Sequence, residues 1–106
     1  MELSALLFAL GVTSNYKGFH QTVAAAALAV ERPEDMLLVT KAVYPVVARR
    51  YHTSWRSVER NIRRAADQAW AHRPDLLSQL AGRELTERPT AREFIAILAG
   101  GYGWLR

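Results

Sequence analysis

The sequence predicts an all-α fold, a compact bundle of about six or seven helices that contains a helix-turn-helix. Apolar residues recur at helical spacing almost throughout, whereas no stretch keeps the alternation of apolar and polar residues that is typical of strands. Prolines and glycines stand where helices are expected to begin and end. A chain of 106 residues is long enough to bury one core, so we expect a single domain over residues 1–106.

The first part of the chain predicts three helices. A first helix covers about 3–10 and stops at Gly11, and an alanine-rich second helix covers about 18–30. Pro33 suits the first turn of a third helix. This helix is expected to end by Tyr44, because the residue before a proline is biased away from helical backbone angles.

The middle of the chain predicts a short helix followed by a long one. Pro45 opens the short helix PVVARR. Ser54 is the expected N-cap of the long helix, which covers 55–71.

After this long helix, two more helices are expected. A short one, PDLLSQL, runs up to Gly82, and residues 82–89 form a loop. Thr90 and Glu93 form a capping box that starts the final helix. The glycine pair 100–101 is expected to end it, and the sequence leaves open whether the tail GGYGWLR packs, dimerises or moves freely.

Positive charge is concentrated in residues 41–73. The formal net charge of the chain is +4, but this segment alone holds eight basic and two acidic side chains, a net charge of +6. Twelve of the fourteen basic residues are arginine, whose planar guanidinium suits phosphate oxygens and guanine edges. Such clustering is expected of a surface that binds a polyanion; a solvated charged face with no partner is the alternative.

Several other functions are not expected. The chain has no cysteine, which excludes disulfides and thiolate metal sites and fits a reducing cytoplasm. The apolar run 22–30 is far shorter than the roughly 20 residues that cross a bilayer, and the acidic N-terminus is unlike a signal peptide. His20, His52 and His72 lack metal-ligand spacing, so we expect no metal. No catalytic triad pattern or glycine-rich phosphate loop occurs, so we expect neither an enzyme nor a cofactor.

The short helix, the linker YHTS and the long basic helix predict a helix-turn-helix, whose second helix typically enters the major groove of DNA. At about 100° per residue, the long helix has two faces. Its apolar face holds Val58, Ile62, Ala65, Ala66 and Ala69, and its opposite face holds Arg56, Arg60, Arg63 and Asp67. His52 or Thr53 occupies the tight turn, where glycine or asparagine is commoner.

Two tryptophans flank the long helix. Trp70 continues the apolar face and is expected in the core. Trp55 either braces the turn or contacts sugar and phosphate.

The segments LGVTSNYKGF, VTKAVYPVVARRYHTSWRSVERNIRRAADQAW and RPTAREFIAILA resemble a known family, and SVERNIRRA is the most telling part. That family is the DNA-binding effector domain of the sporulation-initiation master response regulator of endospore-forming bacteria. The resemblance implies a cytoplasmic helix-turn-helix domain that binds a short promoter box, often as a tandem dimer, contacts RNA polymerase, and activates or represses transcription. The family usually joins this domain to an N-terminal receiver domain, so residues 1–106 are expected to be either a fragment of such a protein or a free-standing regulator.

Site residues follow from the resemblance by position. Glu59 and Arg60 match the pair that reads bases, and Arg63 and Arg64 match positions near the phosphate backbone. The family usually has arginine directly before Val-Glu-Arg, where this chain has Ser57, with an arginine one place earlier. The expected base-reading residues are therefore Arg56, Ser57, Glu59 and Arg60. The expected phosphate-binding residues are Arg49, Arg50, Ser54, Arg63 and Arg64.

Glu59 is an acid within this basic segment. Base readout explains it if its carboxylate accepts a hydrogen bond from a cytosine amino group, beside Arg60 reading guanine. The alternative is a surface ion pair with Arg63 one turn on, worth roughly 0.2–0.5 kcal/mol. We favour base readout.

Two other kinds of binding remain. A protein-interaction module would use the arginine-rich side of the long helix to bind an acidic partner. RNA binding is less favoured, because the aromatic residues are not arranged as an exposed stacking surface.

Overall fold

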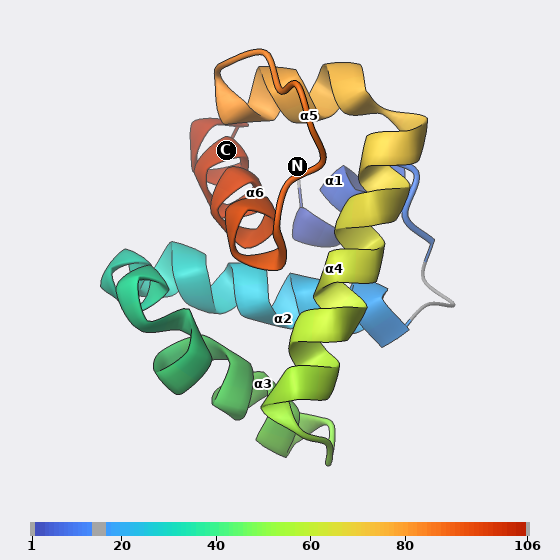
Figure 1. Ribbon diagram of the computed structural model, residues 1–106. Helices are drawn as coiled ribbons and strands as arrows, with labels where there is room; N and C mark the ends of the chain where they lie inside the picture. Colours follow the sequence, from blue (N-terminus) through green and yellow to red (C-terminus); the bar gives the residue numbers. More distant parts are fainter. Residues whose placement is uncertain (1, 14–16, 106) are drawn as a thin grey trace.

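A computed structural model describes residues 2–13 and 17–105, with side chains described up to Tyr102. As predicted, the described part is all-helical and has no β-strand (Figure 1). The order of elements is α1 (Leu3–Ala9), α2 (Lys17–Glu31), the 3₁₀-helix η1 (Pro33–Leu38), the π-helix η2 (Val39–Val43), α3 (Tyr44–Arg50), α4 (Trp55–His72), α5 (Pro74–Ala81) and α6 (Ala91–Leu105).

The predicted stop at Gly11 is confirmed. Its positive φ of 90° lets the chain reverse after α1, which favours glycine. The Gly11 N–H donates to the Phe8 carbonyl and the Val12 N–H to the Leu7 carbonyl, each at 3.0 Å. A Cβ at Gly11 would lie 2.7 Å from the Cβ of His72, so this turn packs directly on the end of α4.

The alanine-rich α2 lies at the centre of the fold and packs against both α4 and α6 (Figure 1). Ala25 and Ala26 are fully buried, and their small side chains allow a close approach. The closest contact is at Gly18, where a Cβ would lie 2.3 Å from the backbone oxygen of Asn61. Only glycine therefore lets the start of α2 rest on the backbone of α4.

The prediction of one helix from Pro33 to Tyr44 is wrong in two respects. The segment winds as a 3₁₀-helix and then as a π-helix, and Tyr44 has helical angles (φ −59°, ψ −42°) that lead straight into α3. A π turn contains more residues than an α turn, so Val39, Val43 and Tyr44 all reach the core. Pro45 follows without disruption because the first turn of α3 needs no N–H donor there.

The predicted start of α6 is confirmed, but its predicted end is wrong. The Thr90 N–H donates to Oε1 of Glu93 at 3.0 Å, and the Glu93 N–H donates to Oγ1 of Thr90 at 3.1 Å, which completes the capping box. The helix then continues through both glycines to Leu105. Gly101 is buried, and a Cβ there would lie 2.6 Å from Cδ2 of Leu80. Its lack of a side chain allows α5 and α6 to pack closely and does not end the helix.

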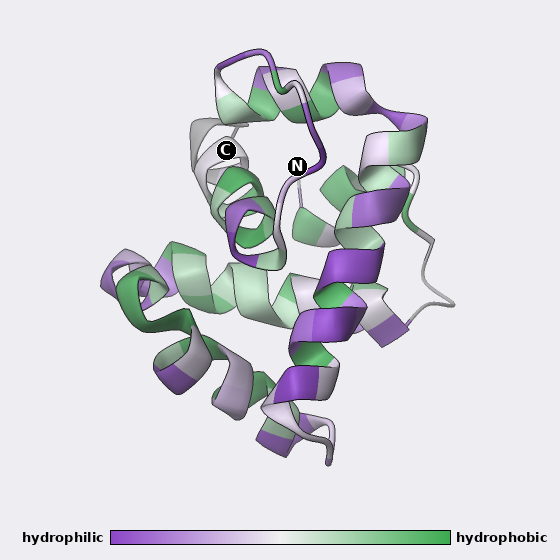
Figure 2. Cartoon of the chain, viewed as in Figure 1, coloured by the Kyte–Doolittle hydropathy of each residue, from purple (hydrophilic) through white to green (hydrophobic). Residues whose placement is uncertain are grey.

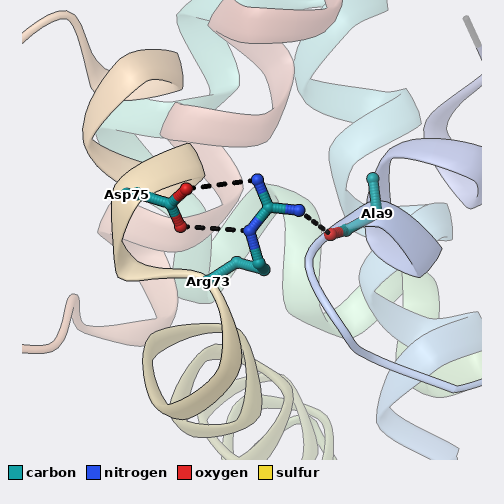
Figure 3. Close-up of polar contacts among 3 residues, drawn as sticks. All are labelled: Ala9, Arg73 and Asp75. Carbon is teal, nitrogen blue, oxygen red and sulfur yellow. Dashed lines mark hydrogen bonds and ion pairs between the residues drawn. The ribbon is translucent and has the colours of Figure 1, made fainter.

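Arg73 ties the junction of α4 and α5 to α1 (Figure 3). Its Nε and Nη2 donate to the two carboxylate oxygens of Asp75 at 3.0 and 3.2 Å, and its Nη1 donates to the Ala9 carbonyl at 3.3 Å. The hydrogen bonds between the two side chains raise the pKa of Arg73 and lower that of Asp75. The far end of α4 is thereby fixed to the rest of the fold.

A candidate nucleic-acid interface on α4

A four-residue turn joins α3 to α4 and forms the predicted helix-turn-helix. His52 has a positive φ of 55°, its N–H donates to the Arg49 carbonyl at 3.4 Å, and the Thr53 N–H donates to the Ala48 carbonyl at 2.9 Å. This is the double hydrogen bond that closes many helices, with histidine where glycine is usual. Ser54 caps α4 as predicted, because its Oγ accepts from the Ser57 N–H at 3.2 Å.

The two predicted faces of α4 are confirmed. All five residues of the apolar face are fully buried: Val58, Ile62, Ala65, Ala66 and Ala69. The two tryptophans at the ends of the helix are partly buried and pack against the core, Trp70 as predicted. Hydrophilic residues follow the opposite side of α4 in Figure 2. A buried aliphatic row therefore holds the polar side in a fixed direction.

Six arginines of the helix-turn-helix point outward and are exposed. They are Arg49 and Arg50 at the end of α3, and Arg56, Arg60, Arg63 and Arg64 on α4. Among the described residues, none of the six is joined to an acid by an ion pair. This surface, which we call the arginine face, keeps its positive charge available to an external anion.

Two neighbouring groups orient arginines at the start of α4. The guanidinium carbon of Arg56 lies 5.1 Å from the centroid of the Trp55 ring, a cation–π contact. Nη2 of Arg60 donates to Oγ of Ser57 at 3.4 Å, and the Ser54 hydroxyl donates to the same oxygen at 3.0 Å. The structure thus brings Ser54, Ser57 and Arg60 together in one hydrogen-bonded chain.

Glu59 is not part of the hydrogen-bonded group formed by Ser54, Ser57 and Arg60. At about 100° per residue it projects about 160° from Ser57, so the two residues lie on opposite flanks of the arginine face. No ion pair joins Glu59 to Arg63 in the part of the chain that the structure describes. Glu59 is instead close enough to Tyr44 to affect its ionisation. Burial raises the pKa of Tyr44 to about 12, with Glu59 adding to the rise and Arg92 opposing it.

Arg88 also affects the charge of the polar side of α4, which the sequence alone did not reveal. Its Nη1 lies 3.5 Å from Oδ1 of Asp67, the acid predicted on the polar side of α4. Arg88 belongs to the loop between α5 and α6, 21 positions along the chain, and no local pattern links the two residues. The pair offsets the negative charge at this end of the polar side.

Residues 3–101 match the family described as sporulation initiation factor Spo0A C terminal. This chain belongs to that family. The match covers all the helices described above, apart from the last residues of α6. Membership of the Spo0A C-terminal family identifies the chain as a DNA-binding domain of a sporulation regulator and places the arginine face in a regulatory rather than an enzymatic family.

Two further findings concern the described residues as a whole. Among residues 2–13 and 17–105, no helix is long and apolar enough to cross a membrane. The same residues contain no group of three or more histidine, aspartate or glutamate side chains placed to hold a metal ion.

Proposed function

We propose that this Spo0A C-terminal family domain is a sequence-specific transcription regulator, with α4 as the recognition helix in the major groove of DNA. The observation that carries the proposal is the arginine face: six exposed guanidiniums, four on α4 and two at the end of α3, have no ion pair among the described residues, and the opposite side of α4 is fully buried. A major groove about 12 Å wide admits one helix, and the N-terminal residues of a recognition helix typically contact base edges, so the residues before and after them would meet phosphates.

Each residue has a role in this proposal. Base edges are read by Arg56, Ser57, Glu59 and Arg60, and phosphates are bound by Arg49, Arg50, Ser54, Arg63 and Arg64. The Ser54 hydroxyl now donates to Ser57, so it must rotate to donate to a phosphate oxygen. Arg60 would lose its weak contact with Ser57 and make two hydrogen bonds to guanine O6 and N7.

For Glu59, a role in reading a base can be distinguished from a general effect of its charge on DNA affinity. Since it lies on the flank opposite Ser57, the two side chains would contact different base pairs. We propose that its carboxylate accepts a hydrogen bond from the amino group of a cytosine. The lack of an ion pair with Arg63 leaves both carboxylate oxygens available for that contact.

We further propose that residues 1–106 act as a single domain on chromosomal DNA in the cytoplasm. Two copies would bind adjacent half-sites of a promoter box, and the bound domain would contact RNA polymerase, as the family resemblance implies.

Selection of binding sites from a random duplex pool tests the proposal, followed by titration of the selected and a scrambled duplex at rising salt. We expect a consensus to emerge and the selected duplex to keep its advantage as salt weakens both complexes. Equal affinity for the two duplexes would refute sequence-specific recognition. Binding to an acidic protein, with no measurable DNA affinity at physiological salt, would favour the protein-interaction module instead.

A matched pair of variants tests the role of Glu59. Glu59→Gln should relax the preference at one cytosine position of the consensus, because an amide can present its donor as well as its acceptor. Glu87→Gln, which changes the charge equally in the loop between α5 and α6, should leave every position unchanged. A Glu59→Gln variant with an unaltered consensus would exclude base readout by this residue.

A further inference from the structure

A groove of about 640 Å³ lies between the start of α2 and the flank of α4 that carries Ser57. Its walls include Lys17 and His20 of α2, Tyr51 and Thr53 of the turn, and Arg60 and Arg64 of α4. The groove is therefore continuous with the arginine face, but one of its walls comes from a part of the chain far from the arginine-rich segment.

The charge of the groove has one sign. Lys17, Arg60 and Arg64 are exposed, and no aspartate or glutamate is among the described lining residues. None of these three cations forms an ion pair within the described part of the chain. Because α2 begins at Lys17 and has no acid in its first turn, the positive end of its backbone dipole adds to the same potential.

Contacts beneath the groove hold its walls in place. Nδ2 of Asn61 donates to Oε1 of Gln21 at 3.1 Å, and the Tyr51 hydroxyl donates to the His20 carbonyl at 3.5 Å. Gly18 packs on the backbone of Asn61 at the same level. The groove is thus already formed in the free domain, and an anion would not have to reorganise the helices to enter it.

We propose that this groove binds one phosphodiester group of the DNA strand that runs along the flank of α4, with Lys17 as its principal charge. Arg64 faces that phosphate from the opposite wall, and the Thr53 hydroxyl is available as a further donor. This inference rests on the proposed function, because a helix in the major groove has a phosphate backbone on each side of it. Lys17 thereby fixes the register of α2 on the duplex and selects no base.

Salt titration of two variants tests the assignment. Lys17→Gln removes the charge and keeps most of the aliphatic stem, and Arg32→Gln removes a charge at the other end of α2. Loss of one phosphate contact should lower the slope of log affinity against log salt by about 0.9. The advantage of the wild type over Lys17→Gln should therefore shrink by about 3.5-fold between about 0.05 M and 0.2 M salt. Arg32→Gln should retain the wild-type slope.

Single methylphosphonate substitutions in the selected duplex then locate the contact. One backbone position should weaken the wild type more than it weakens Lys17→Gln, because the variant has already lost the Lys17 charge and keeps only the contacts of that phosphate with the opposite wall. Circular dichroism of Lys17→Gln should match the wild type, because Lys17 is exposed at the start of its helix.

The outcomes separate this inference from the proposed function. If the wild type prefers the selected duplex and Lys17→Gln keeps its affinity and slope, the groove does not bind the strand and the proposed function stands. A changed base preference in Lys17→Gln would also overturn the assignment, because it would make Lys17 a reader of bases. A wild type with no preference among duplexes would refute both proposals.

Discussion

The helix-turn-helix and the rest of the molecule use arginine in opposite ways. Outside α3 and α4, four arginines are bound to acids in ion pairs: Arg32, Arg73, Arg83 and Arg88. The six arginines of the arginine face have no such pairs in the described part of the chain. The same side chain therefore stabilises internal contacts in one region and remains available for an external anion in the other.

This difference shows that a basic residue in the sequence can belong to an internal ion pair or to an exposed charged surface. Arg73 lies in the basic segment 41–73, yet its guanidinium is bound to Asp75 and to the Ala9 carbonyl. Exposed ion pairs contribute little to stability on average, at about 0–1 kcal/mol each, but they neutralise both partners. Within the basic segment 41–73, pairing with an acid therefore distinguishes Arg73, which stabilises the fold, from the six arginines proposed to bind DNA.

The largest expected effect is the loss of discrimination in Arg60→Ala. An arginine that makes two hydrogen bonds to guanine contributes about 1–3 kcal/mol, or roughly 5- to 150-fold, of preference for that base. Competition between the consensus and its single-base variants would measure it, with Arg83→Ala as a paired-arginine control. If Arg60→Ala keeps the preference at every position, Arg60 does not read bases.

A smaller effect is expected for Arg63→Ala. A phosphate contact carries no sequence information, so the affinities for selected and scrambled duplexes should fall by the same factor. The salt slope should decrease by about 0.9. Unequal losses for the two duplexes would place Arg63 among the base-reading residues instead.

Arg73→Ala should lower the stability of the fold and leave DNA binding unchanged, the reverse of what is expected for Arg60→Ala and Arg63→Ala. Removal of its three hydrogen bonds weakens the contact of α1 with the α4–α5 junction, which should lower the thermal unfolding midpoint by a few degrees. DNA affinity of the folded protein should not change. Thermal circular dichroism and DNA titration on the same sample measure the unfolding midpoint and the affinity. A weaker DNA complex with an unchanged midpoint would show that Arg73 acts in DNA binding and not in the fold.

The smallest effect is expected at the contact between the two regions. Arg88→Ala leaves Asp67 without its cation and should lower DNA affinity by less than about threefold, as expected of an exposed charge. Asp67→Asn should raise affinity slightly, and the double variant should match the single Asp67→Asn. Additive effects would show that the two residues act independently.

Local signals explain what the sequence could predict. The Ser54 cap, the Thr90–Glu93 capping box and the apolar row from Val58 to Ala69 each depend on residues within a few turns of one another. The arginine face follows from the same periodicity. The predicted bounds of the long helix, 55–71, accordingly differ from those of α4 by one residue.

Long-range contacts explain what it could not predict. Arg88 reaches Asp67, and Lys17 reaches the groove beside Arg64, only because the chain folds back on itself. Gly101 lies inside a helix because Leu80 of another helix packs against it. The winding of Pro33 to Val43 likewise depends on the core, which Val39 and Val43 enter, and not on Pro33 alone.

The contact of Gly18 with the backbone of Asn61 has a consequence for engineering. Because this junction involves main-chain atoms, the angle between α2 and α4 does not depend on which side chains point outward from α4. Substitutions at the exposed positions 56, 60 and 63 should therefore leave the arrangement of α2 and α4 unchanged, so these positions suit a library that tests which DNA sequences the domain binds.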